Sequence, residues 1–330
     1  MSWNLVGHQW AAELLQGHIR QGAVRHAYLL TGPRGIGRRT LALRFAQALV
    51  CENPPAAGEF CGVCRSCRQM AAAQHPDLHL VQRAGGSQVI KIDQIRQLER
   101  SLSLTPVVAP RRIALLLDFE EAHPAAANAL LKTLEEPPGQ AVLLLTAESA
   151  EALLPTVASR CEVLRLRPVP PPQLSAALQS RHGLPPQEAE TLAHIAGGRP
   201  GYALHLHQHP ELLQSRRQAL DDLLDLLSAD LIRRFDYAAQ AAKDRQHLIH
   251  LFTLWLSFWR DLLVLTHQAQ VPLTNVDYHA QLDALAALLS PQQVQEALRA
   301  LSRALEDLPR FVNPRLVAEN VMLAFPAVGA

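Results

Sequence analysis

The sequence predicts an α/β protein built on a parallel sheet, followed by a small helical domain and an all-helical C-terminal domain. Three observations lead to this prediction. In the first half of the chain short apolar runs alternate with stretches of helical periodicity, which is typical of a parallel sheet covered on both faces. A glycine-rich loop joins the first apolar run to a helix, as in phosphate-binding proteins. From about Leu212 onward only helical periodicity is found.

The first domain begins with apolar residues at helical spacing over Trp10–Ile19, a pattern that ends at Gly22. His26–Thr31 is a short apolar run that reads as a buried strand, and Arg39–Val50 returns to helical spacing. Further strands are expected at Leu78–Val81, Arg112–Leu117 and Val142–Thr146.

Two breaks divide the chain. The proline-rich stretch RPVPPPQ at residues 167–173 and the stretch GGRPG at residues 197–201 interrupt the regular patterns. We therefore predict an α/β domain over residues 1–167, a small helical domain over 168–208 and a helical domain over 209–330.

Composition narrows the function classes. The 330 residues are enough for two or three domains, and 48% apolar with 18% charged residues is an ordinary globular mix. A formal net charge of +1 gives no strong overall field toward nucleic acid or membrane, which argues against a basic nucleic-acid-binding module.

One long apolar segment, Leu248–Thr266, contains Arg260 and Asp261, so a buried core helix is expected instead of a membrane span, with Trp255 and Trp259 in the core. The N-terminus lacks the pattern of a signal peptide, and we expect a cytoplasmic protein without membrane partners.

The glycine-rich loop reads GPRGIGRRT. Gly32, Gly35 and Gly37 can give the bend of a phosphate loop, but a working loop ends in Lys followed by Ser or Thr, and this chain has Arg38 and Arg39. Arg38 keeps a positive charge on a bulkier planar head, whereas Arg39 cannot ligate Mg²⁺. Thr40 does not take over that role, because one residue along a helix rotates a side chain by about 100°. We expect a glycine-rich turn kept for packing, without ATP as a cofactor.

Four of the five cysteines are clustered in CENPPAAGEFCGVCRSC, namely Cys51, Cys61, Cys64 and Cys67. Disulfides are unusual in cytoplasmic proteins, and four thiolates at this spacing can complete a tetrahedral Zn²⁺ site. Such a closed site is structural, since no position is left for a substrate. Free or redox-active thiols are the alternative, and iron stays open beside zinc. The fifth cysteine, Cys161, lies far along the chain.

The motifs together resemble one family. The altered loop, the cysteine module, NALLKTLEEPP within residues 125–138, SRC within residues 153–166 and FVNPRLVAEN at residues 311–320 follow one another as in the clamp-loader branch of the AAA+ ATPases, the subunits that serve bacterial DNA polymerase III. The likeness covers essentially the whole chain. It implies an AAA+ domain, a small helical lid and a C-terminal collar domain through which subunits assemble.

The resemblance also implies roles for single residues. Counting back from Asn128, the family's Mg²⁺-binding acidic position falls on Leu117 and the next one on Asp118, with Glu120 or Glu121 as substitutes if the alignment shifts. Arg160, in SRC, matches the arginine that reaches the nucleotide of a neighbouring subunit and neutralises charge at the γ-phosphate. An ordinary surface arginine is the alternative.

The function implied is that of a non-hydrolysing clamp-loader subunit that braces the assembly and supplies Arg160 to a neighbouring ATPase. Its partners would be the ATPase subunits and delta, with the sliding clamp and primed DNA reached through the complex. An active ATPase subunit of the same assembly is the second hypothesis, against which Arg38 and Arg39 argue.

Overall fold

The computed structural model describes residues 3–85, 87, 89–310 and 312–328, so Phe311 of the FVNPRLVAEN motif lies outside the described residues. The chain forms two compact units, Met1–Ala177 with Gly198–Tyr202, and Leu178–Gly197 with Ala203–Ala330. The division into three domains at residues 167 and 208 stays a prediction.

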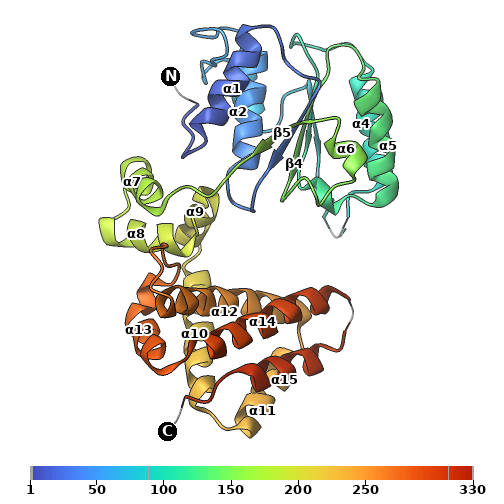
Figure 1. Cartoon of the computed structure of the whole chain (residues 1–330). Helices are drawn as coiled ribbons and strands as arrows, with labels where there is room; N and C mark the ends of the chain where they lie inside the picture. The colour runs from blue at the N-terminus through green and yellow to red at the C-terminus, as the bar shows by residue number, and fades with distance from the viewer. Residues whose placement is uncertain (1–2, 86, 88, 311, 329–330) are drawn as a thin grey trace. The chain divides into compact units, whose positions relative to one another are not determined.

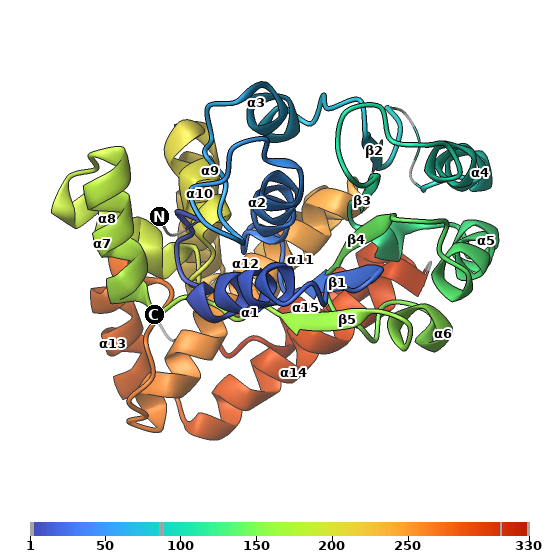
Figure 2. The same ribbon diagram turned by 90° about the horizontal axis from the view of Figure 1, so that it is seen from above.

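The first unit is built on a five-stranded parallel sheet with the strand order β2-β3-β4-β1-β5, visible from above in Figure 2. The strands are β1 (Ala27–Thr31), β2 (Leu78–Val81), β3 (Ile113–Leu116), β4 (Val142–Ala147) and β5 (Glu162–Arg165). Strands β1, β3 and β4 are buried along their whole length, as expected for the interior of a parallel sheet. The predicted α/β fold class is confirmed.

Helices cover both faces of this sheet, because successive strand residues point to opposite sides. Tyr28 and Leu30 pack in one apolar cluster with α1 and α2, whereas Leu29 packs in another with α4 and α5. Figure 1 shows the two layers on either side of the strands. The helical elements are α1 (Gln9–Arg20), α2 (Arg38–Val50), α3 (Arg65–Ala71), α4 (Ile92–Leu102), η1 (Phe119–Glu121), α5 (Pro124–Glu135) and α6 (Pro155–Ala158).

Strand β5 was not among the strands expected from the sequence. It is short and both of its end residues are exposed, because it lies at the edge of the sheet beside β1, with Val163 opposite Leu29. An edge strand of four residues with charged ends carries a weaker apolar signal than the continuous runs of the central strands.

The remaining helices run from residue 171 to residue 324. They are α7 (Pro171–His182), α8 (Pro186–Ile195), α9 (Pro200–Gln208), α10 (Pro210–Ser228), α11 (Leu231–Ala241), α12 (Arg245–Thr266), η2 (Val276–Tyr278), α13 (His279–Leu288), α14 (Pro291–Asp307), η3 (Leu308–Arg310) and α15 (Pro314–Ala324).

Helix α12 is the central helix of the second unit. Among the described residues it is the helix with the length and apolar composition to cross a membrane. However, Trp255 and Trp259 are fully buried in a cluster with side chains of α10, α14 and α15. The buried Asp261 accepts hydrogen bonds from the backbone N–H groups of Thr274 and Asn275 at 2.8 and 2.7 Å. The helix is therefore a core helix, as its composition predicted.

Candidate functional site: the altered phosphate loop and its surroundings

The glycine-rich loop connects β1 to α2 and is held by close backbone packing. Gly32 has φ 143°, and a Cβ there would lie 2.6 Å from the carbonyl oxygen of Leu166. Gly35 has φ 81°, and a Cβ there would lie 2.8 Å from Cβ of Tyr202. The N–H of Gly201 donates to the carbonyl of Gly35 at 2.8 Å. Both glycines are therefore required by the packing of the turn itself.

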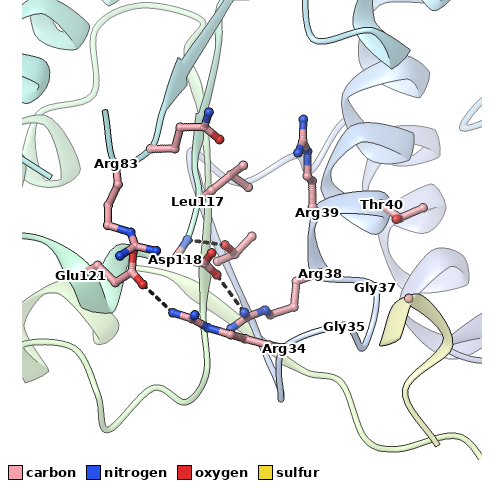
Figure 3. Close-up of a pocket in the computed structure, with 13 residues that line it drawn as sticks. Arg34, Gly35, Gly37, Arg38, Arg39, Thr40, Arg83, Leu117, Asp118 and Glu121 are labelled. Carbon is pink, nitrogen blue, oxygen red and sulfur yellow. Dashed lines mark hydrogen bonds and ion pairs between the residues drawn. The ribbon is translucent and has the colours of Figure 1, made fainter. Parts of the chain in front are cut away.

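A cavity of about 560 Å³ lies beside this loop, at the carboxyl ends of the strands. Figure 3 shows side chains from the loop on one side and from the segments after β2 and β3 on the other. In open α/β sheets this end is where ligands bind. The cavity is lined by Arg34, Gly35, Gly37, Arg38, Arg39, Thr40, Gln82, Arg83, Leu117, Asp118, Glu121, Thr146 and Gly201.

Arg38 forms an ion pair with an acidic residue of the same cavity lining. Its Nη2 donates to Oδ1 of Asp118 at 2.8 Å, and its side chain is only 6% exposed (Figure 3). Within the described residues its Nη1 is buried and has no hydrogen-bond partner. The positive charge that a phosphate loop offers to its ligand is thus already paired inside the chain.

Asp118 occupies an uncommon backbone conformation. It has φ 48° and ψ 54°, a left-handed region that Asp tolerates better than most residues. Its N–H donates to the hydroxyl of the buried Thr146 at 2.8 Å. Through this bond Thr146 holds the turn after β3. Leu117, at the position where the family resemblance places a Mg²⁺-binding carboxylate, is 7% exposed and apolar.

A second set of ion pairs spans the same cavity. The guanidinium of Arg34 contacts Glu121 at 2.5 Å and Glu148 at 3.1 Å, and Arg83 also pairs with Glu121. Sequence reasoning missed these partners, because the residues lie on loops far apart in the chain. The resulting network joins the glycine-rich loop to the segments that follow β2, β3 and β4.

Among the described residues, the remaining polar side chains of this region form no cluster that could hold a cation. Arg39 and Thr40 point away from Asp118 in Figure 3. Both carboxylate oxygens of Glu120 are buried and have no partner among the described residues. Burial raises the pKa of Glu120 above its ordinary value. Of the acidic residues considered from the sequence, Asp118 and Glu121 are held by arginines and Glu120 is enclosed.

Arg112, the last residue before β3, is only 9% exposed. Its guanidinium donates to the carbonyls of Leu104 and Thr105 at 3.0 and 2.8 Å. The side chain therefore ties down the loop that precedes β3.

The four clustered cysteines meet in space. The sulfur atoms of Cys51, Cys61, Cys64 and Cys67 all lie within 4.8 Å of one another and can hold a metal ion. Backbone N–H groups donate to three of these sulfurs, at 3.2 Å to Cys51 and at 3.3 Å to Cys61 and Cys64. Such bonds favour thiolates. The backbone N–H groups of Cys64 and Val63 lower the pKa of Cys61 to about 6, whereas burial raises that of Cys67.

Neighbouring side chains orient this module. Gln47 of α2 donates to the carbonyl of Cys67 at 2.8 Å, and the N–H of Ser66 donates to Glu52 at 3.0 Å. Cys161 lies elsewhere, packed in the apolar cluster on the other face of the sheet. The four sulfurs suit a closed metal site without a position for substrate.

Arg160 lies between α6 and β5 with a half-exposed side chain. Its guanidinium pairs with Glu135 of α5 at 2.7 Å and donates to the carbonyl of Thr156 at 2.9 Å. These contacts keep the side chain on the surface of its own unit and separate from the cavity lining.

Comparisons with known proteins agree with the motif reading. Residues 7–170 match the family model described as DNA polymerase III, delta subunit, and residues 210–326 match the model for the C-terminal part of that subunit. Among solved structures, a DNA polymerase III gamma subunit-related protein of Thermotoga maritima has a TM-score of 0.49 at 19% identity, covering 94% of this chain and 97% of that one.

Several relatives carry one name, DNA polymerase III subunit delta'. That of Pseudomonas aeruginosa is 39% identical over 209 residues, which span 62% of each chain. Those of Escherichia coli and Bacillus subtilis are each 29% identical over 94% of this chain, covering 92% and 94% of the relatives. The two family models and these relatives cover nearly the whole sequence and confirm the resemblance inferred from the motifs. The chain belongs to the family of DNA polymerase III delta' subunits.

Proposed function

We propose that this chain is a non-hydrolysing subunit of a DNA polymerase III clamp loader, which holds the assembly together and lends Arg160 to a neighbouring ATPase subunit. The ATPase subunits and delta are its partners, and the sliding clamp and primed DNA are reached through the complex. The proposal places the protein in the cytoplasm.

The observation that carries the non-hydrolysing role is the pairing of Arg38 with Asp118 beside Leu117. In phosphoryl transfer the loop lysine contacts the phosphates, and a hydroxyl and a carboxylate hold Mg²⁺. Here the cation of the loop is paired internally, and an apolar side chain stands at the carboxylate position. Productive binding of Mg-ATP would require both groups to be replaced.

Arg160 supports the second half of the proposal through its weak anchoring. Surface ion pairs such as that with Glu135 contribute only about 0–1 kcal/mol, so the guanidinium can exchange this carboxylate for a phosphate at little cost. Arg160 also belongs to a motif, SRC, that is shared with the family whose resemblance suggested the role.

The zinc assignment belongs to the same proposal. Four sulfurs, three of which accept backbone N–H bonds, match the donor set of structural zinc sites. When bound, the ion would fix the segment that joins α2 to α3, and it would take no part in phosphate chemistry.

The test is Mg-ATP binding by calorimetry and ATP hydrolysis by the isolated chain, with a variant carrying Arg38→Lys, Arg39→Thr and Leu117→Asp as the comparison. We expect no binding at micromolar ATP by the natural chain. Micromolar affinity together with turnover by the natural chain would establish the alternative, an active ATPase subunit.

A further inference from the structure

We propose that a second metal site, for a divalent transition-metal ion that favours imidazole ligands, lies at the junction of α9 and α10. Its ligands are His205 and His209, and Glu211 is the residue that orients His209. The site is separate from the cysteine module and does not depend on the clamp-loader role proposed above.

His205 lies in the last turn of α9, and His209 directly follows that helix as the residue before α10. The N–H of His209 donates to the carbonyl of His205 at 3.0 Å, so the helical hydrogen-bond pattern continues through the last turn. Residues four apart on a helix are neighbours. Ala203 and Leu206 of α9 are buried, whereas both histidines are exposed to solvent.

The distance between the rings suits a shared ion. The ring centroids of His205 and His209 are 4.5 Å apart, with an interplanar angle of 54°. Two imidazoles that bind one ion through nitrogens at about 2.0–2.1 Å have centroids roughly 5 Å apart. The spacing of the two rings is therefore compatible with one shared ion.

Glu211 supplies the second, independent observation. Its Oε1 lies 2.9 Å from Nδ1 of His209. Metal-binding histidines usually donate the N–H of the ring nitrogen that does not bind the ion to a carboxylate, which fixes the tautomer and leaves the other nitrogen free. With Nδ1 held by Glu211, the lone pair of Nε2 is available to an ion.

His207 on the same helix provides a contrast. Its Nδ1 pairs with Glu188 of α8 at 2.8 Å, and no second histidine ring contact of His207 is found among the described residues. The two-ligand arrangement is therefore specific to His205 and His209. Imidazole nitrogens suit Ni²⁺, Cu²⁺ and Zn²⁺, and water would complete the coordination of an ion held by two side chains.

An ion bound here would link the last turn of α9 to the start of α10. A ligand that binds only the folded state stabilises it by mass action, so the junction would become more rigid and the protein more resistant to heat. The rest of the second unit would keep its structure.

The test is a calorimetric titration of the full-length, zinc-loaded chain with NiCl₂, with the zinc content measured afterwards to show that the cysteine module keeps its own ion. We expect one Ni²⁺ per chain. His205→Ala or His209→Ala should each weaken this binding by roughly 10²-fold, because joining two ligands in one site raises affinity by about that factor or more. Glu211→Gln should weaken it by about tenfold.

His207→Ala is the matched control and should bind Ni²⁺ like the natural chain. Paramagnetic broadening of imidazole proton signals should affect His205 and His209 first. His205→Gln and His209→Gln give a second set of variants, in which the side chain stays polar but the imidazole ligand is lost. Equal Ni²⁺ binding by the natural chain and both histidine variants, or broadening confined to other histidines, would overturn the proposal.

Discussion

At the scale of single residues, Arg38 and Asp118 form an ion pair in which a carboxylate of the chain occupies the guanidinium that could otherwise contact a phosphate. The guanidinium lies 2.8 Å from the carboxylate and is almost fully buried. A buried charge is tolerated when it is paired and hydrogen-bonded. The ion pair thus allows the fold to keep a phosphate-type loop without a phosphate.

Arg38→Ala should lower the free energy of unfolding by about 1–2 kcal/mol, because it removes a hydrogen bond between charged groups and part of the packing of α2. Arg39→Ala, at an exposed neighbouring position, should change it by less than about 0.5 kcal/mol. Urea unfolding followed by circular dichroism measures both. Equal effects would show that the Arg38–Asp118 pair does not stabilise the loop.

Glu120 gives a prediction that depends on pH. Burial raises its pKa, so the folded chain holds the proton more tightly than the unfolded chain. The contribution of Glu120 to the free energy of unfolding is favourable below the ordinary carboxyl pKa. It is lost as the pH rises through the raised pKa of the folded chain. Glu120→Gln should therefore stabilise the protein at pH 7, by about 1 kcal/mol, and have little effect near pH 4. Thermal unfolding at the two pH values, with the exposed Glu13→Gln as control, measures the difference.

At the scale of elements, a metal ion held by the four sulfurs of the cysteine module would take the place of a hydrophobic core in this segment. The segment between α2 and α3 is largely exposed, and Ser66 and Cys67 at the start of α3 are buried. Short segments that cannot bury enough apolar surface commonly depend on such bonds.

Removing the metal should unfold this segment and helix α3. Trypsin should then cut after the exposed Arg65 and Arg68 in the chelated protein and in Cys64→Ser, but not in the metal-bound chain. Cys161→Ser, on the other face of the sheet, is the matched control and should stay resistant. A digestion pattern that does not change on chelation would rule out a structural metal.

At the scale of the whole molecule, the arginines discussed above differ in the number of carboxylates that hold them and in their burial. The loop arginines Arg34 and Arg38 are paired with carboxylates of their own unit. Among the described residues Arg160 contacts one carboxylate, that of Glu135, and one carbonyl, and this weak anchoring is why we propose that it acts on another subunit. The difference between the paired loop arginines and Arg160 supports the proposal that Arg160, and not the altered loop, serves a nucleotide, namely that of a neighbouring subunit.

Arg160→Ala should leave folding and assembly intact and lower the DNA-stimulated ATPase rate of the reconstituted complex by up to about tenfold. Arginine fingers supplied in trans contribute roughly 10³–10⁵ in GTPases, and the smaller loss is expected because the other sites keep their own arginines. Arg165→Ala, at an exposed residue of β5 paired with Glu151, is the control. An unchanged ATPase rate in the Arg160 variant would show that Arg160 does not act as an arginine finger.

The sequence by itself determined the fold class, the central strands, the core helix α12 and the cysteine cluster, because apolar periodicity and cysteine spacing are local properties of the chain. It also pointed to the family through contiguous motifs. Only the tertiary structure decided that Arg38 pairs with Asp118, that Arg112 is buried, that Arg34 and Arg83 share Glu121, and that β5 completes the sheet. Each of these depends on residues brought together from distant parts of the chain, and the direction of a long charged side chain is set by the partners that the fold places around it.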